Sequence, residues 1–168
     1  MRLDLVAWSE YGAVGLLLHC VLLCRTATSG YERQFVYVYA AVSQMDWMVS
    51  EKMNTEQMAV FLSQVSAAHP EDLIVMVLDG ASSHKSKELK RPDNIRLVAL
   101  PPYSPELNPQ EHVCDELREK EFPNRVFNDL DAVVRQLHSG LPKLCTDHEA
   151  LRSLTVWPWI VSLNLKAN

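Results

Sequence analysis

Apolar residues along the chain fall into short runs separated by polar and proline-rich segments. Residues 34–42 (QFVYVYAAV) are rich in aromatic and β-branched side chains, which predicts a strand. Residues 43–54 predict a turn and a second short strand. Apolar positions at helical spacing then predict a helix that starts at Asn54 or Thr55 and stops before Pro70. Its predicted buried face consists of Met58, Phe61, Leu62 and Val65.

Two further apolar runs predict strands that can be neighbours in one sheet. Residues 73–78 (LIVMVL) have the continuous apolar pattern of a central strand covered on both faces, and Asp79 follows directly. Residues 95–100 (IRLVAL) predict the next strand. Strands alternating with helices predict an α/β fold with a mixed sheet flanked by helices, whose functional residues gather at the carboxyl ends of strands.

A proline-dense loop at residues 101–109 separates the last predicted strand from a helix. Asn108 followed by Pro109 is a strong helix start, and Glu111 lies in the first turn of a helix that runs to about Glu121. Further helices are predicted within residues 82–91, 128–139 and 147–154.

The apolar segment at residues 14–24 is too short to cross a membrane, because a helical span needs about twenty residues. It also lacks the basic start and cleavage site of a signal peptide. We expect a buried strand or helix here, and no membrane association.

Composition is that of one globular domain: 168 residues, 48% hydrophobic and 22% charged. The formal net charge of −5 does not point to a DNA-binding protein, because such domains usually carry a basic face. No two cysteines form a CxxC pair, so we expect reduced, mostly buried thiols of a cytosolic protein. The cysteines are Cys20, Cys24, Cys114 and Cys145.

Asp79 and Glu111 are the candidate catalytic and metal-binding residues. Alone, each has a simpler explanation: Asp79 can cap the turn after its strand, and Glu111 is favourable near a helix N-terminus. Together at one sheet edge the two carboxylates would repel each other unless a cation neutralised them, and oxygen ligands suit Mg²⁺ or Mn²⁺. Such a pair can hold two ions about 4 Å apart, an arrangement used for phosphodiester chemistry.

Three stretches stand out as motifs: residues 77–86 (VLDGASSHKS), 100–111 (LPPYSPELNPQE) and 115–120 (DELREK). They resemble the catalytic domain of bacterial insertion-sequence DDE transposases related to mariner elements, and the resemblance covers roughly residues 29–162. It implies a ribonuclease-H-like fold and a triad of two aspartates and a final acid that binds two divalent ions. By motif position, Asp79 matches the second aspartate and Glu111 the final glutamate, while His84 and Asn108 match polar positioning residues.

The resemblance implies hydrolysis at a transposon end, followed by attack of the freed 3′-hydroxyl on target DNA. The expected partners are therefore transposon-end and target DNA, a separate helix-turn-helix polypeptide that recognises DNA, and a second copy of the chain, since two ends are handled together. The expected location is the cytoplasm, in association with the nucleoid.

The N-terminal part departs from the family pattern. Asp4 lies at about the right place for the first aspartate, but residues 5–28 look foreign to the family, as if the reading frame had shifted. We therefore divide the chain into an atypical segment, residues 1–28, and a catalytic domain, residues 29–168.

The alternative to an active enzyme is an inactive truncated remnant with an incomplete triad. A different metal nuclease on the same fold is disfavoured by the proline-rich motif.

Overall fold

The computed structural model describes residues 14–41, 44–78, 88–99 and 110–155. One mixed sheet has the strand order β3-β2-β1-β4-β5, and β6 pairs with β1. The strands are β1 (Val14–Thr26), β2 (Gly30–Ala40), β3 (Met45–Ser50), β4 (Ile74–Leu78), β5 (Ile95–Ala99) and β6 (Val126–Phe127). The helices are α2 (Thr55–Ala68), α3 (Gln110–Glu121), α4 (Leu130–Thr146) and α5 (His148–Thr155).

β1 is the longest strand and lies at the centre of the sheet. It pairs antiparallel with β2 along almost its whole length, from Leu16–Ala40 to Thr26–Gly30. Its other edge pairs in parallel with β4 at residues 14–16 and with β6 at residues 25–26. The apolar segment predicted as a buried strand or helix is therefore a strand of the sheet.

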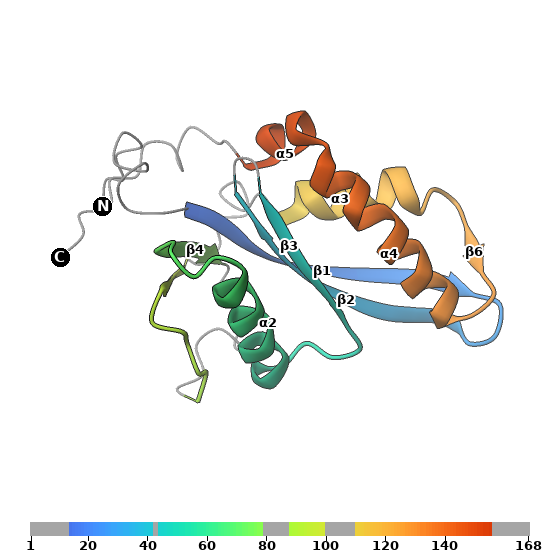
Figure 1. Ribbon diagram of the computed structural model, residues 1–168. Helices are drawn as coiled ribbons and strands as arrows, with labels where there is room; N and C mark the ends of the chain where they lie inside the picture. The colour runs from blue at the N-terminus through green and yellow to red at the C-terminus, as the bar shows by residue number, and fades with distance from the viewer. Residues whose placement is uncertain (1–13, 42–43, 79–87, 100–109, 156–168) are drawn as a thin grey trace.

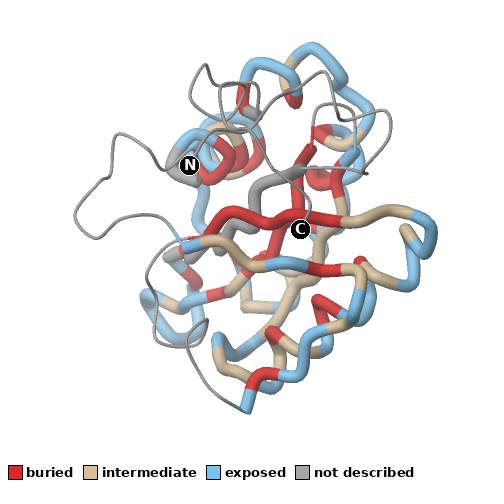
Figure 2. Tube along the Cα trace, turned by 90° about the vertical axis from the view of Figure 1, so that its left-hand side faces the viewer, coloured by how far each residue is buried: buried red, intermediate tan, exposed pale blue. Residues whose placement is uncertain are grey.

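Helices cover both faces of the sheet (Figure 1). Side chains alternate along a strand, so Val36 and Val38 of β2 join the core under α3, α4 and α5, whereas Tyr37 and Tyr39 join the core under α2. Buried segments run through the middle of the molecule between these layers (Figure 2). The predicted mixed α/β sheet flanked by helices is confirmed. None of the helices described is long and apolar enough to cross a bilayer.

The α2 helix begins and packs as its sequence predicts. The Oδ1 atom of Asn54 accepts a hydrogen bond of 2.8 Å from the backbone amide of Gln57, which satisfies one of the unpaired donors of the first turn. The buried residues of α2 are the four predicted ones: Met58, Phe61, Leu62 and Val65.

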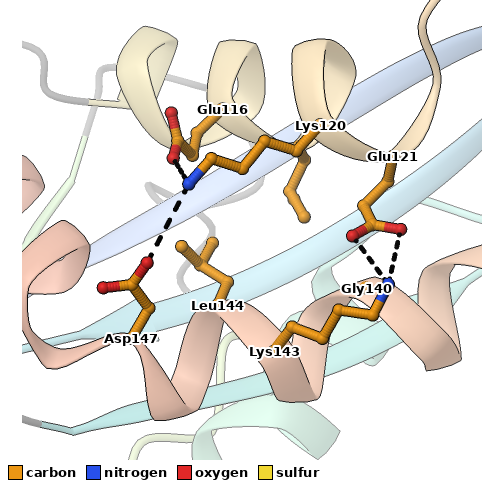
Figure 3. Close-up of a pocket in the computed structure, with 8 residues that line it drawn as sticks. Glu116, Lys120, Glu121, Gly140, Lys143, Leu144 and Asp147 are labelled. Atoms are coloured by element: carbon orange, nitrogen blue, oxygen red, sulfur yellow. Dashed lines mark hydrogen bonds and ion pairs between the residues drawn. The ribbon is translucent and has the colours of Figure 1, made fainter.

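The α4 helix does not end at residue 139 as predicted, but continues to Thr146 through Gly140 and Pro142. Leu141 and Leu144 are buried in the core, so tertiary packing outweighs the local cost of glycine and proline in a helix. Gly140 also leaves room for Glu121 of α3, whose carboxylate accepts hydrogen bonds from Gln136 Nε2 at 2.7 Å and from Lys143 Nζ at 3.1 Å (Figure 3).

Two buried tyrosines of β2 give a matched test of this core. Burial, and then the negative charges of Asp46 and Asp72, raise the pKa of Tyr39, and its hydroxyl has no hydrogen-bond partner in the described structure. The Tyr37 hydroxyl accepts a hydrogen bond from the Asn54 amide at 3.2 Å. We expect Tyr39→Phe to raise the free energy of unfolding by about 1 kcal/mol and Tyr37→Phe to lower it by about 1 kcal/mol in urea titrations.

The raised pKa of Tyr39 also predicts a pH dependence. The folded chain favours the neutral phenol of Tyr39. The free energy of unfolding is therefore unaffected by this group below the ordinary tyrosine pKa of about 10 and falls as the pH rises above it. Tyr39→Phe should therefore weaken the loss of stability above pH 10. Equal losses of stability in Tyr39→Phe and Tyr37→Phe at neutral pH would contradict the different hydrogen bonding of the two hydroxyl groups.

Gly140 tests the contact between α3 and α4. A Cβ atom at Gly140 would lie 2.4 Å from Cγ and 2.7 Å from Cδ of Glu121, a side chain held by Gln136 and Lys143. We expect Gly140→Ala to cost about 1–3 kcal/mol of stability, although alanine is the better helix former by about 1 kcal/mol. The exposed neighbour Ser139 is the control, and Ser139→Ala should change stability by less than about 0.5 kcal/mol. A stabilising Gly140→Ala would show that Glu121 moves freely.

Candidate functional site

The strands next to the candidate carboxylates lie side by side in the sheet. β4 and β5 pair in parallel, with Leu78 beside Ala99 at their carboxyl ends. On the other edge of β4, Leu16 of β1 lies beside Val77. The expected neighbour relation of the two strands is thus confirmed, and Asp79 is the residue that follows the carboxyl end of β4 in the chain.

α3 carries Glu111 as its second residue and packs on β1, the strand that pairs with β4. Val113 and Leu117 of α3 are buried in the same core cluster as Val77 of β4. Along the chain, Val113 is two residues from Glu111 and Val77 is two residues from Asp79. The fold therefore places the helix that carries Glu111 on the face of the sheet to which Val77 belongs, over the strand next to β4.

The side chains of the predicted site are not themselves described. Asp79, His84, Asn108 and Asp4 lie outside the described residues, and for Glu111 the structure gives the helical backbone alone. Within the described part of the chain, no group of three or more His, Cys, Asp or Glu side chains could hold a metal ion. The donors for such an ion would therefore have to include residues outside it.

β1 carries no residue that could serve as the first aspartate of the triad. Its sequence, VGLLLHCVLLCRT, contains no acidic residue. Asp4 precedes the start of β1 by ten residues, so its assignment as the third carboxylate stays a prediction.

A pocket lies between α3 and α4, and its charges are already paired (Figure 3). Lys120 contacts Glu116 and lies 3.9 Å from Asp147, and the hydrogen bond with Glu116 raises the pKa of Lys120. Glu121 is paired with Lys143. We interpret this pocket as part of the packing between the two helices, distinct from the predicted carboxylate site.

A cluster at the C-terminal end of α2 was not predicted. His69 Nε2 lies 2.7 Å from Asp46 Oδ2, and His69 Nδ1 lies 3.8 Å from Asp72 Oδ2. Asp46 precedes His69 by 23 residues, so no local spacing in the sequence indicates this contact. It ties the end of α2 to β3.

The expectation of four reduced cysteines is wrong, because one disulfide bond takes two of them. Cys114 is disulfide-bonded, whereas Cys24 and Cys145 are free thiols. Burial raises the pKa of Cys24, and the positive charge of Arg118 opposes that shift. No pattern in the sequence predicts the bond, because the cysteines show no paired spacing.

The fold is similar to that of solved transposase structures. Against the catalytic domain of Mos1 mariner transposase the TM-score is 0.65 at 13% identity, covering 87% of this chain and 76% of that one. A structure of the same domain with Raltegravir and Mg gives a TM-score of 0.65 at 15% identity, over 85% of this chain and 76% of that one. These likenesses show the fold, and the predicted ribonuclease-H-like sheet is confirmed.

The Mos1 strand transfer complex gives a TM-score of 0.66 at 14% identity and covers 87% of this chain. The match takes in 51% of the transposase chain, so this chain spans about half the length of that protein.

Sequence comparison identifies the family. The chain is 32% identical over 130 residues to the uncharacterized protein y4pE/y4sA of Sinorhizobium fredii. The aligned region covers 74% of this chain and 96% of that protein. The sequence pattern of the DDE superfamily endonucleases matches residues 24–134, a range that includes Asp79 and Glu111. This chain therefore belongs to the DDE superfamily endonucleases.

Proposed function

We propose that this chain is the catalytic domain of a metal-dependent DNA transposase, which cuts transposon ends and joins the freed 3′-hydroxyl to target DNA. The observation that carries the proposal is the position of α3, with Glu111 in its first turn, over β1 and in one core cluster with Val77 of β4, the strand that precedes Asp79. Membership of the endonuclease family and the likeness to mariner transposase folds support it.

Asp79 and Glu111 are the proposed metal ligands. Asp79 follows β4 in the chain, and Glu111 lies on the helix that shares a core cluster with Val77 of that strand. Two carboxylates meeting there form an oxygen donor set that suits Mg²⁺ or Mn²⁺. Two such ions, when bound, would activate the attacking oxygen and stabilise the leaving oxygen. His84 and Asn108 are the proposed positioning residues.

Asp4 is the proposed third ligand. No acidic residue of β1 competes for this role, since the strand carries none. The same observation favours the alternative, a remnant that keeps the fold but lacks a complete triad. The proposed division assigns residues 1–28 to an atypical segment and residues 29–168 to the catalytic domain, which holds most of the family match at residues 24–134.

The proposed partners follow from the reaction. Transposon-end and target DNA are the substrates, a helix-turn-helix polypeptide supplies sequence recognition, and a homodimer holds two ends together. The likeness of the fold to the transposase in the Mos1 strand transfer complex supports an assembly of this kind. The proposed location is the cytoplasm, with the nucleoid.

Calorimetric titration with Mn²⁺ tests the site. Loss of groups that merely orient metal ligands weakens binding by about 10–100-fold, so loss of a direct ligand in Asp79→Ala or Glu111→Ala should weaken it by more than about 100-fold. Asp4→Ala should do the same if Asp4 is the third ligand. The control is Glu119→Ala, an exposed carboxylate on the same helix as Glu111, which should leave the affinity unchanged.

Strand cleavage then tests the reaction. Variants that lose Mn²⁺ should also lose Mn²⁺-dependent cutting of a transposon-end duplex, while Glu119→Ala should cut at the wild-type rate. If the folded chain binds no Mn²⁺ at millimolar concentration, the proposed enzymatic activity is wrong. The chain is then better described as an inactive transposase remnant.

A further inference from the structure

α2 covers only part of its side of the sheet. Its Phe61 ring packs on Tyr37 of β2, with the ring centroids 5.7 Å apart. From Tyr37 toward the β1–β2 turn, the β2 residues on the same face are Tyr31, Arg33 and Phe35, and none of them belongs to the core under α2. The hairpin end of β1 and β2 extends away from α2 in Figure 1.

The strand register gathers four exposed side chains on this uncovered surface. Arg25 of β1 lies opposite Tyr31 of β2 and also beside Val126 of β6, and partners in register share a face. Arg33 lies two residues beyond Tyr31, on the same face. Tyr31 is 69% exposed and Val126 58%, and both arginines are exposed. We call Arg25, Tyr31, Arg33 and Val126 the hairpin face.

The hairpin face is positively charged in a chain with a net charge of −5. Arg25 and Arg33 form no ion pair within the part of the chain that the structure describes. The neighbouring Glu32 pairs with Cys24, on the opposite face, and accepts a hydrogen bond of 2.6 Å from the Thr26 hydroxyl. The two guanidinium groups are therefore available as charge-assisted donors to an anion.

We propose that the hairpin face binds the sugar–phosphate backbone of duplex DNA without reading its sequence. Arg25 and Arg33 occupy diagonal positions, whose side chains stand about 7–8 Å apart and can contact separate phosphates. The Tyr31 hydroxyl is a further donor of the kind found at phosphates. The inference rests on the proposed function for its substrate class, but it concerns a surface apart from the carboxylate site.

The length of β1 relates this surface to the carboxylate site. Leu16 lies beside Val77, near the carboxyl end of β4, and Arg25 is nine residues further along the same strand. Nine residues of strand span about 30 Å, close to the roughly 34 Å of one turn of B-DNA. A duplex that reacts at the carboxyl end of β4 can therefore reach the hairpin face about one helical turn away.

A protein partner fits this surface less well. A stable interface buries about 800 Å² and 20–30 residues on each side, around an apolar centre. The exposed apolar side chains of the hairpin face are Tyr31 and Val126, flanked by two unpaired charges. This composition favours phosphate contacts over a protein interface.

The test is the salt dependence of DNA binding, measured by fluorescence anisotropy with the full chain and a 20-bp duplex of arbitrary sequence in EDTA. Each phosphate contact contributes about 0.9 to the slope of log affinity against log salt, so Arg25→Gln/Arg33→Gln should reduce that slope by about 2. The control is Arg91→Gln/Arg135→Gln, which removes the same charge from exposed positions elsewhere and should leave the slope unchanged. Urea titrations establish that all variants are folded.

Three outcomes would overturn the proposal: no change in slope for Arg25→Gln/Arg33→Gln, an equal change in both double variants, or no DNA binding by the wild type at low salt. Loss of self-association in sedimentation with an unchanged slope would instead assign the surface to a second copy of the chain. Because EDTA removes the metal, failure here leaves the Mn²⁺ titration to decide the carboxylate site independently.

Discussion

The parallel pairing of β4 on both edges is the constraint on which the rest of the structure depends. All five residues of β4 are buried, with β1 on one edge and β5 on the other. A strand so short and so apolar is stable only when both of its faces are buried. The core under α2 buries one face of β4, and the core under α3, α4 and α5 buries the other. Since parallel strands end at the same edge, the polar residues that follow them are brought to one place.

The helix that carries Glu111 is held near both of its ends. Val113 and Leu117 bury its inner face in the core, and Glu121, its last residue, lies over Gly140 among the side chains of α4. Held in this way, α3 keeps its first turn in a fixed place relative to the sheet. Metal sites need such rigid support, because ligands must stay within about 0.5 Å of the productive geometry.

Local patterns in the sequence predicted the elements that are marked by periodicity or capping within a short stretch of the chain. The buried face of α2, the strand before Asp79 and the helix after the proline-rich loop all follow from periodicity and capping. The sequence did not predict the true end of α4, the pairing of His69 with Asp46 or the disulfide at Cys114, because each depends on residues distant in the chain. For the candidate site, motif position indicated two carboxylates but gave no pattern that fixes the first.

The centre of the sheet shows why folding and chemistry make separable demands on a sequence. The position of β1 requires an apolar strand that can hydrogen-bond on both edges, and VGLLLHCVLLCRT meets that requirement without an acidic residue. Catalysis by a carboxylate triad would need an acid beside the end of β4 as well. A chain can therefore keep the complete sheet while one metal ligand is missing. For this chain, metal affinity rather than folding is the property that would distinguish an active enzyme from a remnant.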